Sequence, residues 1–395
     1  MASPPDRLDS WKEIAAHVRR TVRTVQRWES ACGLPVHRHG HRQSSSVYAF
    51  RSELDAWWLS RKDPDVVLQE GRARPPPGRP STHASARDLS LMARAQWNAR
   101  TVDGIRRSVA LATQATERDP DCAPAYGMLA LAYAVLASYT PEPVNRPMER
   151  ARQAARRALE LDPSVTDAHT ALGLVHLSYD WRWADAERAF LNATRLAPQD
   201  ATAWSWFGFW HLSRGHEEQA LVETRRAERL DPASLIIQTQ VGWILYFTRR
   251  YAEALDQLGR TLTCDPHFWR TYLNFAWCYM ATGRNEDGVH ALETTVALND
   301  YPLLRTVLAR AYARAGRERE ARAMIAQIGS ADRYFSAYYL AQAWAALGHL
   351  DEAGRLLLKA CDDREWHLIF LRSDPGIDDL RGHPAYRAVV DRMNF

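Results

Sequence analysis

The sequence predicts a mostly α-helical protein in which a small N-terminal domain precedes a long solenoid of antiparallel helix pairs that ends in a helical cap. Three observations predict this organisation. Residues 1–62 are dense in helix and turn signals, residues 63–84 are rich in Pro and Arg and lack core-forming side chains, and residues 85–395 show a helical pattern with a recurring period. We therefore expect an N-terminal domain, a flexible linker and a repeat array with these boundaries.

The first part of the N-terminal domain predicts two short helices. Ser10 followed by Glu13 matches the capping box that opens a helix, and the apolar residues after Ser10 recur at helical spacing. Thr21 is well placed to cap a second helix, and Gly33 is well placed to end it. The two helices would be joined by a tight turn.

The second part of the N-terminal domain predicts a two-stranded β-ribbon and a third helix. The short runs 36–39 and 47–50 flank a turn-prone centre, and Ser52 with Asp55 opens a further helical pattern. Two helices followed by such a wing resemble the winged helix-turn-helix of the MerR and excisionase group. The segment RTVQRWESACGLP, residues 23–35, looks like the part of that motif that runs through its recognition helix. A Pro-rich linker replaces the long dimerising helix of MerR-type proteins, so their effector sensing and dimerisation are not implied.

Charge and this resemblance together point to double-stranded DNA as a partner. Residues 1–62 hold 11 Lys and Arg against 6 Asp and Glu, whereas the rest of the chain is close to neutral. The resemblance implies that the second helix enters the major groove, where the planar guanidinium of Arg suits guanine or phosphate. The alternative is a solvated basic face. The residues expected at DNA are Arg23, Thr24, Gln26 and Arg27 on the second helix, Arg38, His39 and Arg42 on the wing, and Lys12, Arg19 and Arg20 beside them.

The array is predicted from regularly spaced proline residues that mark the ends of helices. Pro163, Pro198, Pro232 and Pro266 are spaced by 35, 34 and 34 residues, and Asp300 follows after another 34. Proline ends a helix because it lacks the N–H donor and clashes with the preceding turn. Within each unit a small residue follows a large one in the first helix, which lets two helices approach closely. Examples are Leu172-Gly173, Phe207-Gly208 and Phe275-Ala276.

These units resemble the tetratricopeptide repeat, a pair of antiparallel helices with a period of 34 residues. The resemblance runs from about Leu89 to about Asp362 and covers about eight units. The second unit carries an insertion that we expect to be an exposed loop, and residues 374–393 look like a helical cap. Glycines fall where the first helix of a unit should end in a left-handed residue, at Gly215, Gly283, Gly316 and Gly348.

An aromatic ladder is the candidate binding feature of the array. By the resemblance, the position that lines the concave groove holds Leu174, Phe209, Trp243 and Trp277 in four successive units. One interpretation is a surface that binds an extended peptide or another ligand. The other is packing between helices, which is the role of most aromatic residues in helical proteins. The residues near the ladder are Trp206, Tyr246 and Asn274.

Several kinds of site are not expected. The sequence holds no G-x-S-x-G, P-loop, H-E-x-x-H or Gly-rich dinucleotide turn, so we predict no enzyme and no cofactor. The five cysteines are scattered without a C-x-x-C pair, which argues against structural zinc and a disulfide framework. His37, His39 and His41 alternate, but no second ligand cluster completes a metal site. Without a signal peptide or a convincing membrane span, we expect a cytoplasmic protein.

Two functions are consistent with this organisation. The first is a DNA-binding transcriptional regulator whose repeat array binds a protein, a peptide or another effector. One small module makes few base contacts, so this function predicts a homodimer or an operator with several sites. The alternative is a protein-interaction scaffold whose N-terminal module docks on protein rather than on DNA. Neutralisation of the arginines by Glu13 or Glu29, or burial of the second helix, would favour the scaffold.

Overall fold

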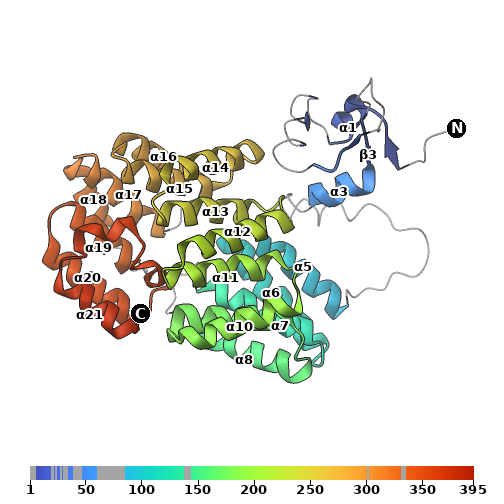
Figure 1. Ribbon diagram of the computed structural model, residues 1–395, viewed down its shortest axis with the longest axis horizontal. Coiled ribbons are helices and arrows are strands. Elements are labelled where there is room, and N and C mark those ends of the chain that lie inside the picture. The colour runs from blue at the N-terminus through green and yellow to red at the C-terminus, as the bar shows by residue number, and fades with distance from the viewer. Residues whose placement is uncertain are drawn as a thin grey trace.

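The computed structural model is a helical solenoid with a small module at its N-terminal side (Figure 1). The structure describes residues 6–18, 22, 25–26, 29, 34–38, 47–59, 85–137, 144–299, 302–330 and 335–395.

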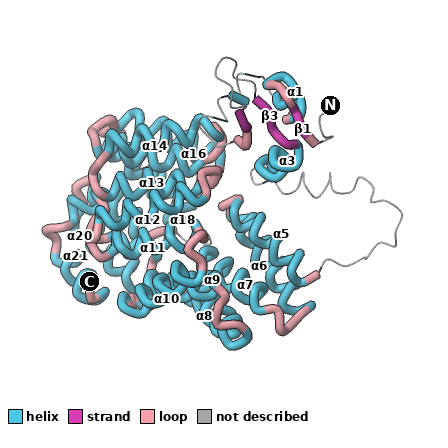
Figure 2. The backbone as a smooth tube through the Cα atoms, turned by 45° about the vertical axis from the view of Figure 1, so that its right-hand side comes forward, coloured by secondary structure: helices cyan, strands magenta, loops and turns pink. Residues whose placement is uncertain are grey.

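Eight helix pairs follow one another in the described part of residues 85–362, as the repeat pattern predicts (Figures 1 and 2). Each helix packs against the next one along the chain, except that α19 packs on α17 rather than on α18. The pairs are α5 (Ala86–Asn98) with α6 (Val102–Arg118), α7 (Ala123–Leu136) with α8 (Asn145–Leu161), α9 (Thr166–Val175) with α10 (Trp183–Leu196), α11 (Ala201–Ser213) with α12 (Glu217–Leu230), α13 (Leu235–Phe247) with α14 (Tyr251–Cys264), α15 (Trp269–Ala281) with α16 (Asn285–Leu298), α17 (Pro302–Arg314) with α18 (Glu318–Ser330), and α19 (Ala337–Ala346) with α20 (Leu350–Asp362).

The regularly spaced prolines make the same hydrogen bond in four successive units. In each unit a side chain six residues later donates a hydrogen bond to the proline carbonyl, which cannot join the helix that has just ended. The hydrogen-bonding atom is a ring nitrogen, an amide or a phenol, so the geometry recurs although the residue type does not. The pairs are His169 with Pro163 (2.9 Å), Trp204 with Pro198 (2.9 Å), Gln238 with Pro232 (2.7 Å) and Tyr272 with Pro266 (3.0 Å).

Small residues in the first helix of each pair set how closely the second helix packs. A Cβ atom on Gly173 would lie 2.6 Å from the ring of Phe190, and one on Gly242 would lie 2.7 Å from the side chain of Leu258. These distances are too short for a real contact, so only glycine fits at these positions. The close approach predicted from the recurring small residues is confirmed.

The turns between paired helices also follow the expected chemistry. Gly215, Gly283, Gly316 and Gly348 have φ angles between +74° and +83°, which is the left-handed region that glycine adopts readily. Three other units place Arg100, Trp181 and Arg249 at left-handed turns, with φ of +53°, +57° and +59°. Trp181 follows a single π-helical turn, η1 (His176–Asp180).

The π-helical turn is held by a partly buried ion cluster. Asp180 contacts His176 Nδ1 at 2.8 Å and the guanidinium of Arg152 at 2.7 and 3.0 Å. Burial alone would raise the pKa of Asp180, but hydrogen bonds from His176 and Arg152 outweigh it and lower the pKa well below its ordinary value. The cluster therefore favours an ionised Asp180 at the end of α9.

The N-terminal module contains a three-stranded sheet in the order β1 (Arg7–Leu8), β3 (Val47–Phe50), β2 (His37–Arg38). The antiparallel pairing of β2 with β3 agrees with the two-stranded ribbon expected from the sequence, whereas the strand β1 was not expected. Helix α1 (Trp11–His17) is capped by Ser10 as predicted, and α3 (Arg51–Leu59) follows β3 directly. A third strand on the other edge means that a simple two-stranded wing is not what the structure describes.

The module has its own small core, and that core reaches the array. Leu8, Ile14, Val25 and Leu54 form one apolar cluster, which also includes Leu235 and Cys264 from α13 and α14. Val25 lies in the predicted second helix and is fully buried. The module is thus joined to the array by apolar contact as well as by the linker.

Three expectations about chemistry can be compared with the described residues. Cys122, Cys278 and Cys361 are free thiols, but Cys264 is disulfide-bonded, so the argument against disulfides is wrong at that position. Within the described ranges no group of three His, Cys, Asp or Glu residues is placed to hold a metal ion. The helices of the same ranges include none that is long and apolar enough to cross a membrane.

Candidate binding groove

The chain turns back on itself after the last helix pair. Arg364 adopts a left-handed conformation with φ of +54°, and the Glu365 N–H bonds back to the Ala360 carbonyl. The following residues, which we call the cap, form the short 3-10 helices η2 (Trp366–Phe370) and η3 (Pro375–Leu380) and then α21 (Pro384–Met393). The reversal at Arg364 directs η2 into the concave side of the array.

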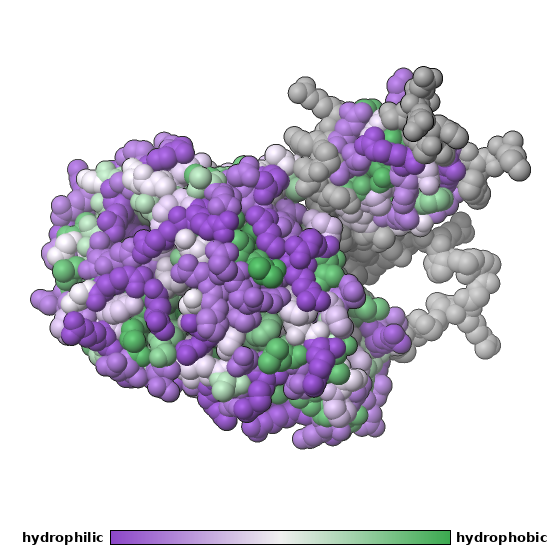
Figure 3. All heavy atoms as spheres, in the orientation of Figure 1, coloured by the Kyte–Doolittle hydropathy of each residue, from purple (hydrophilic) through white to green (hydrophobic). Residues whose placement is uncertain are grey.

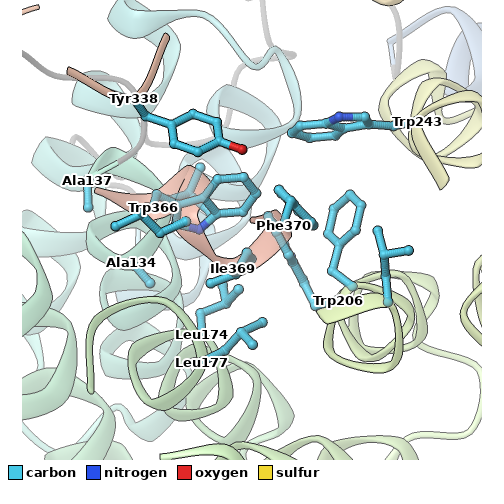
Figure 4. Packing of buried hydrophobic residues seen from close by; sticks show 14 of the residues in the cluster. Ala134, Ala137, Leu174, Leu177, Trp206, Trp243, Tyr338, Trp366, Ile369 and Phe370 are labelled. Carbon is cyan, nitrogen blue, oxygen red and sulfur yellow. The ribbon is translucent and has the colours of Figure 1, made fainter. Parts of the chain in front are cut away.

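The cap inserts two aromatic rings between the first helices of several units. Trp366 lies 6.1 Å from Trp206 and 5.9 Å from Trp243, measured between ring centroids. Phe370 lies 5.4 Å from Phe209 and 5.3 Å from Trp243. Figure 4 shows Trp366 and Phe370 among Trp206, Trp243, Leu174 and Leu177. The cap therefore occupies the groove that the array would otherwise leave open.

The aromatic ladder is consequently interior in this structure. The ladder residues and the residues near them are between 0% and 7% exposed, because the cap and neighbouring helices cover them. The packing interpretation describes their present state, and an open partner groove at these side chains does not. The residues concerned are Trp206, Phe209, Trp243, Tyr246, Asn274 and Trp277.

Two buried carboxylates fix the cap to the array. Asp374 accepts hydrogen bonds from the phenols of Tyr246 (3.2 Å) and Tyr338 (2.7 Å) and from the Gln342 amide (2.9 Å). Burial, together with the nearby Asp374 charge, raises the pKa of both phenols well above its ordinary value. The tyrosines therefore remain hydrogen-bond donors to Asp374 throughout the physiological pH range.

Glu365 is the second buried carboxylate. It accepts hydrogen bonds from Ser336 Oγ (2.5 Å) and from the Ala337 N–H (2.6 Å), at the first turn of α19. Burial raises the pKa of Glu365 to about 7, although these hydrogen bonds lower it in part. In the same segment, burial and then the charge of Arg270 lower the pKa of His367 to about 3.

Two ion pairs and a hydrogen bond from a tryptophan hold the outer parts of the cap. Arg249 donates two hydrogen bonds of 2.8 Å to Asp378, and Arg314 pairs with Asp379. At the other end, Trp183 Nε1 donates to the Asn394 carbonyl at 2.9 Å. Contacts from α10 to α17 thus converge on one C-terminal segment.

The floor of the groove contains polar atoms that the cap does not use. Trp243 Nε1, Trp277 Nε1 and Asn274 Oδ1 are buried and have no hydrogen-bond partner among the described residues. Buried donors and acceptors are nearly always paired in folded proteins, and an unpaired one costs about 1–3 kcal/mol. Trp243 and Trp277 belong to the ladder that the sequence singled out, and Asn274 is one of the residues expected near it.

A recess of about 380 Å³ remains open beside the filled groove. Its walls are the C-terminal half of α5 and the first turns of α11 and α13, and Trp206 lies between the recess and the cap. The volume is within the range of pockets that hold small ligands or a few residues of a peptide. The lining residues are Arg94, Trp97, Asn98, Arg100, Gln199, Asp200, Ala201, Thr202, Ser205, Trp206, Leu230, Asp231, Ser234, Ile236, Ile237 and Gln240.

The recess carries balanced charges. Arg94 pairs with Asp167 of α9, and Arg100 stacks on Trp97 with its guanidinium carbon 3.4 Å from the ring centroid. Burial and the neighbouring charge of Asp167 raise the pKa of Asp200, which caps α11. Two arginines, two aspartates and several amides and hydroxyls give a surface with both donors and acceptors.

Most of the expected DNA-contacting residues lie outside the described residues. Among those described, Lys12 and Gln26 are exposed, and Arg38 pairs with Glu29 at 2.7 Å. This pairing is one of the features that favour the scaffold, since it neutralises a cation of the wing. The residues outside the described ranges are Arg19, Arg20, Arg23, Thr24, Arg27, His39 and Arg42.

Sequence reasoning missed the cap residues that fill the groove. Trp366, Phe370 and Asp374 are four residues apart and belong to a segment that follows the last repeat unit. The signal was an apolar run, 366–371, that continues no repeat and has no partner helix of its own. Such a run predicts burial somewhere, but its destination depends on the curvature of the array.

Comparison with known proteins agrees with the fold. No family model matches the chain. Superkiller protein 3 of Schizosaccharomyces pombe is 24% identical over 224 residues, which are 55% of this chain and 16% of that protein. The human IFIT1 dimer with m7Gppp-AAAA has a TM-score of 0.53 at 14% identity, covering 79% of this chain and 78% of that one.

A shorter solved structure is also similar. YrrB, described as a TPR protein with an unusual peptide-binding site, is 23% identical and covers 48% of this chain and 92% of its own, with a TM-score of 0.32. The chain spans about one sixth of the length of superkiller protein 3, so only the repeat fold is shared with it. The repeats from α5 to α20 form an α-solenoid of the tetratricopeptide (TPR) type.

Proposed function

We propose that this protein is a non-enzymatic protein-interaction scaffold whose TPR array binds an extended polypeptide on its concave side. The observation that carries the proposal is that the concave side already holds a polypeptide, namely the cap. The cap is bound through inserted aromatic rings, buried carboxylates and rim ion pairs. A surface that binds one segment in this way is suited to bind another where space remains.

The recess is the part of the concave side that is open to a partner. Its mixed donors and acceptors suit peptide backbone, which presents both N–H and C=O groups. Leu91 is 64% exposed and lies one turn before Arg94 on α5, so it offers an apolar contact near the mouth. The face of the molecule seen in Figure 3 is mostly hydrophilic, and its apolar patches are small and scattered, so this face offers a partner no comparable apolar contact among its described residues.

A phage-displayed library of random peptides, selected on the full-length protein, tests this proposal. Selected peptides would be synthesised and their Kd measured by calorimetry against a variant with Asn98→Ala and Gln199→Ala, two exposed recess residues. We expect at least one peptide to bind the variant about tenfold more weakly than the parent protein, which corresponds to about 1.4 kcal/mol. The matched control carries Gln153→Ala and Asn192→Ala, outside the recess. Equal binding to all three proteins, or no binder, would refute the proposal.

A second candidate function is a DNA-binding regulator, which the charge of the N-terminal module favours. The excess of Lys and Arg over Asp and Glu is confined to residues 1–62, and a basic module on a neutral body suits a polyanion. Pairing of Arg38 with Glu29 reduces this charge on the wing. The IFIT1 structure contains m7Gppp-AAAA, which is a polyanion, but the balanced charges of the recess here do not favour a polyanion.

Fluorescence anisotropy with random duplex DNA at several salt concentrations separates the two functions. Two results together would support phosphate contact by the second helix. Binding of the parent protein should weaken steeply with salt, and an Arg23→Ala/Arg27→Ala variant should bind the DNA more weakly than the parent. Identical behaviour of the parent and the variant, or no binding at low salt, would leave the scaffold as the function.

A further inference from the structure

The groove filled by the cap holds a polypeptide segment through spaced side chains, as a ligand site does. Trp243 Nε1, Trp277 Nε1 and Asn274 Oδ1, on α13 and α15, are buried without a hydrogen-bond partner among the described residues, as are several other polar atoms of the array. The three atoms on the floor of the groove are two donors and one acceptor, which is the combination that a peptide backbone would satisfy.

The cap engages this floor through a short linear pattern. Trp366 and Phe370 are four residues apart and fill the space beside Trp243, and Asp374, four residues later, receives the phenols of Tyr246 and Tyr338. Anchoring by regularly spaced side chains is how grooves recognise peptide segments. The backbone of the cap does not reach the three unpaired floor atoms.

We infer that the groove formed by α11, α13, α15 and α19 is a polypeptide-binding site that residues 365–380 occupy in cis. A partner segment with the pattern Trp-x-x-x-Phe-x-x-x-Asp displaces the cap and binds through the same side-chain contacts. This inference rests on the proposed function, because it names the partner chemistry of the concave side. The cap is a tethered competitor, so displacement requires a ligand that overcomes its high effective concentration.

Loosening the cap in the full-length protein tests the inference. The probe is a fluorescein-labelled synthetic peptide with the sequence of residues 363–383, and the variant carries Trp366→Ala and Phe370→Ala. We expect the peptide to bind this variant at least about a hundredfold more tightly than the parent protein, because the groove is vacated only in the variant. A control peptide with Ala in place of both aromatic residues should not bind. Failure of the folded variant to bind the probe peptide would overturn the inference.

Native-state hydrogen exchange on the parent protein provides a test that needs no variant. We expect amides of 366–380 to exchange through an opening that leaves α13 protected, as a displaceable segment requires. Exchange of the cap only together with α13, through global unfolding, would overturn the inference. That result, together with library peptides bound at the recess, would leave the proposed function intact. Binding of the probe peptide to the variant supports the inference even where no recess binder is found.

Discussion

Trp243 on α13 and Trp366 in the cap lie with their ring centroids 5.9 Å apart, and Phe370 contacts the same ladder ring at 5.3 Å. Trp243 is therefore covered by two side chains from a segment that is remote in sequence. The contact makes the cap a part of the concave side rather than a lid over the end of the array.

Removal of the Trp366 ring should reveal how much the cap stabilises the protein. Trp366 is buried among Trp206, Phe209 and Trp243, so Trp366→Ala should lower the free energy of unfolding by about 3–5 kcal/mol. Urea unfolding followed by circular dichroism measures this change. Leu91→Ala, at an apolar residue that is 64% exposed, is the control and should change the free energy by less than about 0.5 kcal/mol. A loss below about 1 kcal/mol for the Trp variant would contradict the packing described.

Substitution of Glu365 should change how stability depends on pH. Its pKa of about 7 in the folded protein is above its ordinary value of 4.5, so its contribution is fully present below pH 4.5 and is lost as pH rises through 7. Glu365→Gln does not titrate. From pH 4.5 to 8 the unfolding free energy of the variant should therefore rise relative to the parent by about 3 kcal/mol.

The difference between the two proteins is the quantity to follow, because His367 acts in the opposite direction. Its pKa of about 3 is below the ordinary 6.5, so stability from the neutral imidazole is lost as pH falls below 6.5. This contribution is common to both proteins and cancels. A difference that stays constant from pH 4.5 to 8 would show that Glu365 is ionised throughout.

Glycine-to-alanine substitutions in the array should change stability in opposite directions, depending on the atoms that surround each glycine. Gly173→Ala places a methyl group 2.6 Å from the buried Phe190 ring and should destabilise the protein by about 1–3 kcal/mol. Gly259→Ala is the matched control, because no atom lies within 4 Å of its added methyl. Within helix α14 this change should stabilise by about 0.5–1 kcal/mol. Thermal unfolding of both variants tests the opposite signs, and equal shifts would refute the close packing at Gly173.

Arg249 makes two opposing contributions to stability, one from its backbone conformation and one from the ion pair of its side chain. Its φ of +59° is unfavourable for a residue with a Cβ, so Arg249→Gly should stabilise the turn by about 1 kcal/mol. The same change removes the ion pair with Asp378, which is half-exposed and contributes about 0–1 kcal/mol. The gain should therefore be larger in an Asp378→Asn background. A double-mutant cycle measures the coupling, and equal gains in both backgrounds would show that the pair is not stabilising.

The parts of the fold that local chemistry determines could be predicted, and those that depend on distant contacts could not. Regular spacing of Pro163, Pro198 and Pro232 indicates helix ends, since proline acts on its own turn. The strand Arg7–Leu8 is two residues long and shows no periodicity. The left-handed turn at Arg364 carries no glycine signal, yet it decides where Trp366 goes.

The candidate site was predicted in its residues but not in its state. Trp243 and Trp277 were assigned to the concave groove from their positions in the repeat, and Asn274 was placed near them. In the structure Trp243 contacts both Trp277 and the cap ring of Trp366. Whether a groove is empty depends on a segment that contacts it from elsewhere in the chain, and no local pattern encodes that contact. The recess was missed for the same reason, because α5 meets α11 and α13 only through the curvature of the solenoid.

The junction between Trp183 and the C-terminal segment has a consequence for how the array resists force and heat. An open solenoid is quasi-one-dimensional, since each unit touches only its neighbours and can fray from either end. Here the stack of Trp183 on Phe395 and the pairs Arg249–Asp378 and Arg314–Asp379 connect units far apart in the series. The C-terminal segment therefore cross-links units of the array, which lose their independence. Unfolding of a unit that contacts this segment removes a contact that stabilises the others.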